Sequence, residues 1–216
     1  MSHHPTIRFD IGGAHHVVPD RKAAAMTIGY LVVISSLLYF CSDVVEVAQG
    51  GFSTGQLWLT LIAEATIPVF VIGFAVTRTQ RPLGWVGDLS AIVYAYAFLY
   101  FTGTVVYALT NGTKDYEVLT DQLGLTLTAH GVMMVVAGIG FGCSVIRARL
   151  FPTWTAVALM VGVVLVGLTQ GLPEGVQLIA AGTRDVGFVG MGVAQIRSAA
   201  PRTIRPNSRP DVQHAC

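Results

Sequence analysis

Four ionisable side chains lie well inside apolar stretches of this 216-residue sequence: Glu64, His130, Arg184 and Asp185. An ionisable group is costly in hydrocarbon unless it faces a cavity or a partner, so such residues are candidates for function. Counted from the outer ends of their stretches at ~1.5 Å per residue, all four lie roughly 10 to 15 Å deep. We therefore predict one polar layer that opens outward as a pocket, with Tyr100 at a similar depth on an antiparallel helix.

The chemistry expected of this layer is proton transfer. Adjacent residues on a helix point about 100° apart, so Arg184 and Asp185 should each find a partner on another helix. We expect Arg184 to pair with Glu64, which leaves Asp185 near His130; the reverse pairing remains open. An unpaired Asp185 in a medium of low dielectric would hold a proton and donate it. Glu64 or His130 would then accept a proton, and Arg184 and Tyr100 would bind the substrate.

A proline supports the assignment of Glu64 to a site. Pro68 removes the hydrogen bond to the carbonyl group of Glu64 and bends the helix there. Broken helices at membrane depth are tolerated chiefly where they line a cavity or where neighbours satisfy the freed groups. The predicted kink and the acid therefore fit a single site.

The composition predicts the environment of these residues. The chain is 53% hydrophobic and 12% charged, its formal net charge is +1, and its mean hydropathy is +0.62. Soluble domains carry about twice that charged fraction. We expect an integral membrane protein whose first partner is the lipid bilayer. The sequence lacks the cationic face that nucleic acid requires, so we expect no nucleic-acid partner.

Six apolar runs are long enough to cross a bilayer, and none shows the two-residue alternation of a membrane β-strand. They occupy residues 23–41, 57–77, 89–110, 122–146, 153–172 and 175–196. The predicted fold is all-α, a polytopic bundle of six transmembrane helices in one domain, 23–197. Residues 1–22 form a cytoplasmic tail, and residues 198–216 form a disordered basic tail.

The distribution of basic residues predicts the orientation, because Lys and Arg in short loops resist translocation. Eleven of the 13 basic residues fall on one side of the predicted spans: Arg8, Arg21, Lys22, Arg78, Arg81, Arg147, Arg149, Arg197, Arg202, Arg205 and Arg209. Acidic residues collect on the other side. We expect a multi-pass protein of the cell membrane with both termini in the cytoplasm.

A metal site is not predicted. His130 is the one histidine within the spans, and no Glu-x-x-His spacing accompanies it. A single intramembrane histidine also excludes bis-histidine haem. We expect neither a metal nor another cofactor. The glycines of the last helix, Gly187, Gly190 and Gly192, and the Gly138/Gly142 pair predict close helix packing.

Two segments carry a resemblance to known proteins. The run RARLFPTWTAVALMV at 147–161 and the run AAGTRDVGFVGMGVAQIR at 180–197 resemble uncharacterised six-span membrane proteins of actinomycetes. This resemblance covers the last third of the chain. The chain is also similar to integral-membrane terpene cyclases, which carry an essential Glu on the second helix and an Asp on the last, where Glu64 and Asp185 stand. It departs from that family in having six spans instead of seven, and in having Ala63 and Ala65 where aromatic residues flank the Glu.

Three functions fit these observations. The first is an intramembrane enzyme that isomerises or cyclises a lipophilic small molecule by acid–base chemistry. The rings of Tyr94, Tyr96 and Tyr100 could then face a carbocation, although Tyr94 and Tyr96 equally suit packing. The second is a proton-coupled transporter of a small molecule. The third is a non-catalytic membrane complex subunit or homo-oligomer, in which the polar layer holds helices together.

Overall fold

The computed structural model describes residues 21–77 and 82–200, and these residues form helices and no strand. The elements are α1 (Arg21–Gln49), α2 (Thr54–Thr77), α3 (Gly84–Asn111), α4 (Tyr116–Leu123), α5 (Leu125–Arg147), α6 (Thr153–Leu168) and α7 (Glu174–Ala199). The all-α prediction is confirmed for this part of the chain. The two predicted tails lie largely outside the described residues.

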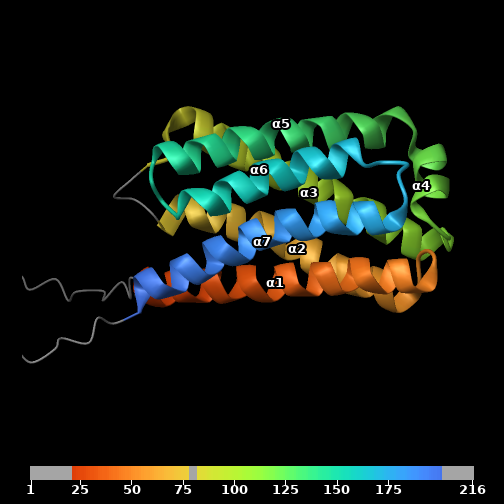
Figure 1. Cartoon of the computed structure of the whole chain (residues 1–216), viewed down its shortest axis with the longest axis horizontal. Helices are drawn as coiled ribbons and strands as arrows, with labels where there is room; N and C mark the ends of the chain where they lie inside the picture. The colour runs from red at the N-terminus through yellow and green to blue at the C-terminus, as the bar shows by residue number, and fades with distance from the viewer. Residues whose placement is uncertain (1–20, 78–81, 201–216) are drawn as a thin grey trace, which may run out of the picture.

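The six longer helices form a closed ring. Each packs against the preceding and following long helix, and α7 closes the ring against α1. They run along the long axis of the molecule, while the short α4 lies across one end (Figure 1). We call the end where α1 begins and α7 finishes the terminal end, and the opposite end, with α4, the far end.

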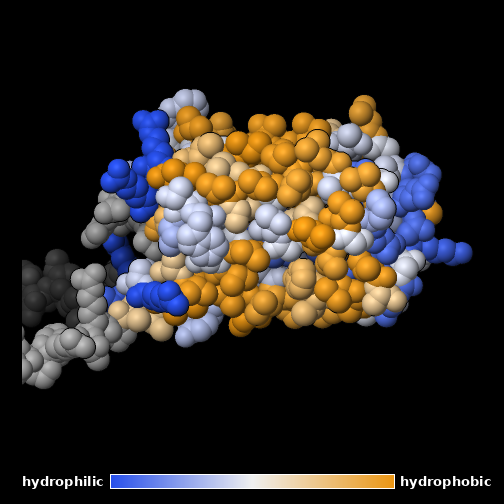
Figure 2. Space-filling view, in the orientation of Figure 1, coloured by the Kyte–Doolittle hydropathy of each residue, from blue (hydrophilic) through white to orange (hydrophobic). Residues whose placement is uncertain are grey.

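Four helices, α1, α2, α3 and α5, are long and apolar enough to cross a membrane, with mean hydropathy of 1.6 to 2.1 in their most apolar stretches. Helix α6 is apolar but has 16 residues, and α7 has 26 residues that include Arg184 and Asp185. On the face shown in Figure 2, hydrophobic residues dominate the middle of the molecule, and the most hydrophilic residues lie at the two ends. These apolar helices are compatible with an integral membrane protein.

Several helix boundaries differ from the prediction; α6, for example, ends at Leu168 instead of residue 172, and two differences are larger. Helix α1 continues beyond the predicted end at Cys41 as far as Gln49. The predicted helix 122–146 is in fact two helices. Gly124 interrupts it with φ +54° and ψ −131°, a conformation that favours glycine. Asp115 caps the short helix α4 by accepting a hydrogen bond from the Val118 amide at 2.8 Å.

An aromatic core fills the ring toward the terminal end. Ring centroids lie 5.1 Å apart for Phe70 and Phe188, and 4.9 Å apart for Phe74 and Phe151, both in edge-on geometry. Tyr94 stacks on Phe141 at 6.4 Å. These aromatic side chains come from α2, α3, α5, α7 and the connection before α6. They therefore pack most of the helices of the bundle against one another.

Glycines hold α7 close to both of its neighbours. A Cβ atom at Gly192 would lie 2.8 Å from the Gly29 carbonyl oxygen on α1, and one at Gly187 would lie 2.6 Å from the Leu159 nitrogen on α6. A Cβ atom at Gly162 would lie 2.2 Å from the Arg184 nitrogen. The predicted close packing is confirmed at these contacts, and it fixes where α7 presents Arg184 and Asp185.

Candidate functional site

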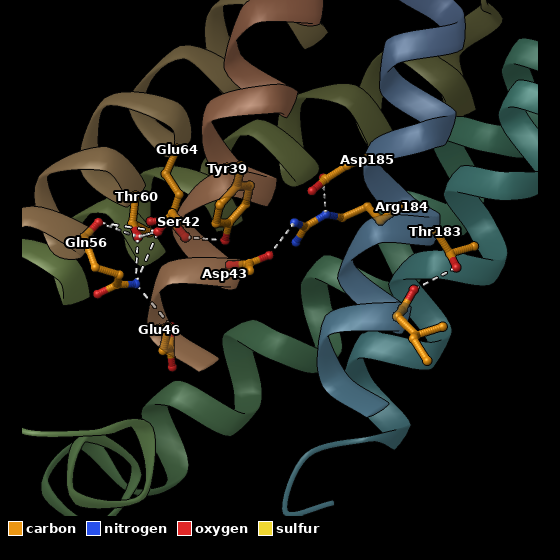
Figure 3. A network of polar contacts seen from close by, with 11 residues as sticks. Tyr39, Ser42, Asp43, Glu46, Gln56, Thr60, Glu64, Thr183, Arg184 and Asp185 are labelled. Atoms are coloured by element: carbon orange, nitrogen blue, oxygen red, sulfur yellow. Dashed lines mark hydrogen bonds and ion pairs between the residues drawn. The ribbon is translucent and has the colours of Figure 1, made fainter. Parts of the chain in front are cut away.

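Polar side chains line up on the facing sides of α1 and α2 toward the far end. On α1 they recur at intervals of three and four residues, and on α2 at intervals of four, so each set occupies one helix face. Together with two residues of α7 they form what we call the polar cluster (Figure 3). Its members are Tyr39, Ser42, Asp43, Glu46, Gln56, Thr60, Glu64, Arg184 and Asp185.

The part of the cluster nearest the far end is centred on Gln56. Its side-chain nitrogen donates to Glu46 Oε2 at 3.0 Å and lies 3.2 Å from Ser42 Oγ and 3.1 Å from Thr60 Oγ1. The hydroxyl groups of Ser42 and Thr60 also hydrogen bond to each other. These bonds join α1 to α2, and they give Glu46, which lies beyond the predicted helix end at Cys41, a hydrogen-bond partner on α2.

Tyr39 lies between Glu64 and Arg184. Its hydroxyl donates to Glu64 Oε1 at 2.6 Å, and the guanidinium carbon of Arg184 lies 4.3 Å from the centre of its ring. The second carboxyl oxygen of Glu64 is buried and has no hydrogen-bond partner. Glu64 and Arg184 therefore do not pair directly, and this prediction was wrong. Tyr39 connects the two residues: its hydroxyl binds Glu64, and the face of its ring contacts Arg184.

Arg184 pairs with its own neighbour in the sequence. Its Nε donates to Asp185 Oδ1 at 2.9 Å, and its Nη2 lies 4.0 Å from Asp43 Oδ2. We expected the side chains of adjacent residues to point apart. This is true of their Cα–Cβ bonds, but the arginine side chain is long enough to bend toward Asp185. Both residues are buried, and Asp185 Oδ2 has no hydrogen-bond partner.

His130 and Tyr100 form a separate pair on α5 and α3. Their rings stack with centroids 3.6 Å apart and planes 7° apart, and His130 Nδ1 lies 2.8 Å from the Thr126 carbonyl oxygen. Tyr96 lies beside them, with its ring centroid 5.8 Å from that of His130. The expected pairing of Asp185 with His130 was therefore wrong. The predicted single layer divides into the polar cluster and this stacked pair.

A groove of about 550 Å³ runs along the outside of α7, against α1 and α6. Asp185 is 4% exposed and belongs to its lining, so it lies at the base. The neighbouring walls are mostly apolar and include Leu37, Phe40, Ile179, Val186 and Val189. Asp185 thus belongs both to the groove and, through Arg184, to the polar cluster.

The prediction missed the contribution of α1. Four polar residues of α1 recur with the spacing of a helix face, and they follow directly on the apolar run at 23–41: Tyr39, Ser42, Asp43 and Glu46. Ending the span at Cys41 assigned Asp43 and Glu46 to a loop. Extending the helical period through these residues would have identified a polar face on α1.

The arrangement suits proton transfer better than metal binding. It offers carboxyl groups, a guanidinium group and a phenol in a buried setting, with one carboxyl group at an apolar groove. Within residues 21–77 and 82–200, no three His, Cys, Asp or Glu side chains gather in a way that could hold a metal ion.

Comparisons of the chain with protein-family models, with curated proteins and with solved structures find no match.

Proposed function

We propose that the chain is a six-span protein of the cell membrane with both termini in the cytoplasm. Helices α6 and α7 would complete the crossings begun by α1, α2, α3 and α5, because they belong to the same closed ring. Arg147 ends α5 and Arg197 lies in the last turn of α7, both at the terminal end. Asp115 and Glu117 begin α4 at the far end. This asymmetry favours a cytoplasmic terminal end.

We propose further that the protein is an intramembrane enzyme that moves a proton on a lipophilic substrate. The observation that carries this proposal is the position of Asp185. One of its carboxyl oxygens is held by Arg184, the other is buried without a hydrogen-bond partner, and Asp185 is one of the residues that line a groove with mostly apolar walls. A buried polar atom without a partner calls for an explanation, and a mostly apolar pocket with a few polar groups is the usual setting of a binding or active site.

In this proposal one carboxyl group serves as both acid and base. Asp185 rests as a carboxylate paired with Arg184. When it takes up a proton, it gives that proton to a carbon–carbon double bond, whose electron pair forms the new C–H bond. The resulting cation loses a proton from a neighbouring carbon to Asp185, so the double bond has moved and the carboxyl group is restored. Cyclisation would differ only in a ring closure between the two transfers. Arg184 stabilises the carboxylate that exists between them.

Glu64 has a positioning role in this scheme. It holds the Tyr39 hydroxyl, and the Tyr39 ring in turn supports the Arg184 guanidinium group. Aromatic rings attract such cations most strongly where water is excluded. His130 and Tyr100, which we expected at the same site, lie on α5 and α3 and take no part in the proposed reaction.

The aromatic core favours an enzyme over a proton-coupled transporter. A transporter needs access to its site from both sides of the membrane. Phe70, Phe74, Phe141 and Phe188 are fully or almost fully buried and pack with Tyr94 between the polar cluster and the terminal end. The polar cluster thus reaches the middle of the bundle from the far end and meets packed rings there.

The test is deuterium incorporation, which detects turnover whatever the identity of the substrate. Protein in nanodiscs is incubated with fractionated lipid extract in D2O, and mass spectrometry detects lipids that gain carbon-bound deuterium. We expect incorporation by the wild type and at least a tenfold loss with Asp185→Asn. The matched control is Asp88→Asn, because Asp88 is an exposed carboxyl group on α3. A folded Asp185→Asn protein that incorporates deuterium at the wild-type rate would refute the proposal.

A further inference from the structure

The groove along α7 also indicates what kind of molecule it takes. We infer that it binds a single-chain lipid whose polar end is a hydrogen-bond donor, a hydroxyl or an amine, with that end placed at Asp185 Oδ2. This inference deepens the proposed function. The binding of the lipid is argued from the groove, and only the turnover of the bound lipid rests on the proposed function. The argument has three steps, which concern the polar end, the charge and the chain.

The polar end must be able to donate, because Asp185 Oδ2 is a buried acceptor without a partner; the Ser36 hydroxyl, which also lines the groove, can donate or accept and so suits the same end group. Asp185 Oδ1 already receives a hydrogen bond from Arg184, whereas Oδ2 is buried and receives none. Thr183, which also lines the groove, already donates its hydroxyl to the Ile179 carbonyl oxygen at 2.8 Å. A ligand that donates to Oδ2 removes the cost of a buried acceptor without a partner.

The charge around Arg184 disfavours an anionic lipid. The guanidinium group is shared between Asp185 on one side and Asp43 on the other, at 2.9 and 4.0 Å. Two carboxyl groups thus face one arginine. Its buried Nη2 has no hydrogen-bond partner, but Arg184 is not among the residues that line the groove, so it offers no cation there to a fatty acid or a phosphate. A like charge beside Asp185 would instead be repelled in this buried setting.

The walls fit one extended apolar chain. Lining residues of α7 run from Ile179 to Val189, ten residues or roughly 15 Å along the helix axis. Phe40 narrows the groove from α1, since a Cβ atom at Gly182 would lie 3.0 Å from its ring. Val186 and Ile179 are more than half exposed on this side, so in a bilayer the groove lies open to the hydrocarbon. A lipid would enter from the side.

Photolabelling with three matched probes tests the inference. The probes share one chain with a mid-chain diazirine and differ only in the end group: a primary alcohol, a primary amine or a carboxylic acid. They are photolysed with the protein in phosphatidylcholine nanodiscs at neutral pH, and labelled peptides are quantified by mass spectrometry. Residues 179–189 report the groove, and residues 129–139 on the exposed side of α5 report general lipid contact.

We expect the alcohol and the amine to label residues 179–189 at least fivefold more than the acid does, with no such preference at residues 129–139. If the alcohol and the amine both label the groove, a hydrogen-bond donor is enough for binding. If the amine alone labels it, a cation is needed. Either outcome supports a donor at Asp185. Equal labelling by all three probes, or preference for the acid, would overturn the inference.

Two variants link the labelling to the groove. Asp185→Asn replaces an acceptor by a group that can also donate, so the preference over the acid should fall to near unity. Val186→Trp fills the groove and should abolish labelling of residues 179–189 by every probe, even if Asp185→Asn does not fold. Its matched control is Val136→Trp on α5, because Val136 is similarly exposed. Unchanged groove labelling in Val186→Trp would contradict the assignment.

The two proposals fail in different ways. Donor-selective labelling without deuterium incorporation would leave a lipid-binding protein and end the catalytic proposal. Incorporation that depends on Asp185, with no preference among the end groups, would keep the enzyme and end the inference about its ligand.

Discussion

The two halves of the helix ring are built on different principles. Toward the far end, hydrogen bonds join α1 to α2, and an ion pair between Asp43 and Arg184 joins α1 to α7. Toward the terminal end, aromatic rings fill the centre. Rings supply contact area and little direction, whereas polar groups impose direction at the cost of desolvation. The comparison separates a half of the bundle that is held by apolar packing from a half that is held by directional contacts between polar side chains.

The largest expected effect lies in the aromatic half. Phe74→Ala removes a fully buried ring that contacts Phe70 and Phe151. The free energy of unfolding should fall by ~3–5 kcal/mol, as for other large-to-small changes in a core. Denaturant unfolding in mixed micelles measures this. Val76→Ala on the same helix is the control, because Val76 is 66% exposed. Equal losses in the two variants would contradict the assignment of stability to this half.

A smaller effect is expected in the polar half. Tyr39→Phe keeps the ring under Arg184 but removes the hydroxyl that donates to Glu64 Oε1. Glu64 is then buried with both oxygens unpartnered, which should cost ~1–3 kcal/mol of unfolding free energy in the same denaturant measurement.

The same variant separates a positioning role from a purely structural one. Deuterium incorporation, compared at equal amounts of folded protein, should fall in Tyr39→Phe because Glu64 no longer anchors the ring that supports Arg184. Tyr96→Phe serves as the control, since Tyr96 is 54% exposed. If incorporation per folded molecule stays at the wild-type value, the cluster holds helices together and does not tune the site.

The smallest effect is expected at the stacked pair on α3 and α5. His130→Ala removes the ring that stacks on Tyr100, and such contacts contribute ~0.5–1.5 kcal/mol. His130→Phe keeps a ring and should restore most of that stability. Neither variant should change deuterium incorporation or probe selectivity. A loss of activity in His130→Ala that His130→Phe does not restore would return His130 to the site.

The helices of this fold are largely predictable from the sequence, because long apolar runs leave the chain few alternatives in lipid. The run at 57–77 corresponds to α2, and the run at 89–110 lies within α3. The break at Gly124 was not predicted, since an apolar run conceals a single glycine whose backbone turns. Close packing at Gly187 and Gly192 was predicted correctly from residue size alone.

The site was predictable only in part. Burial of Glu64, Arg184 and Asp185 follows from their depth, and all three are at most 4% exposed. Depth along a helix does not specify direction around it, and so His130 was wrongly grouped with them. The contacts of Glu64 and Arg184 were missed for two reasons. Glu64 and Arg184 both contact Tyr39, which is uncharged, and the long Arg184 side chain can bind the adjacent Asp185.

The contact between Gly29 and Gly192 joins the first long helix to the last. The Arg184 side chain that pairs with Asp43 arrives only with α7, the helix made last during synthesis. Until then the acidic face of α1 lacks its cationic partner, and the groove against α7 does not exist. A chain that stops before α7 would lack both the arginine that faces Asp43 and the helix that closes the bundle, so the polar cluster is complete only when the last helix is in place.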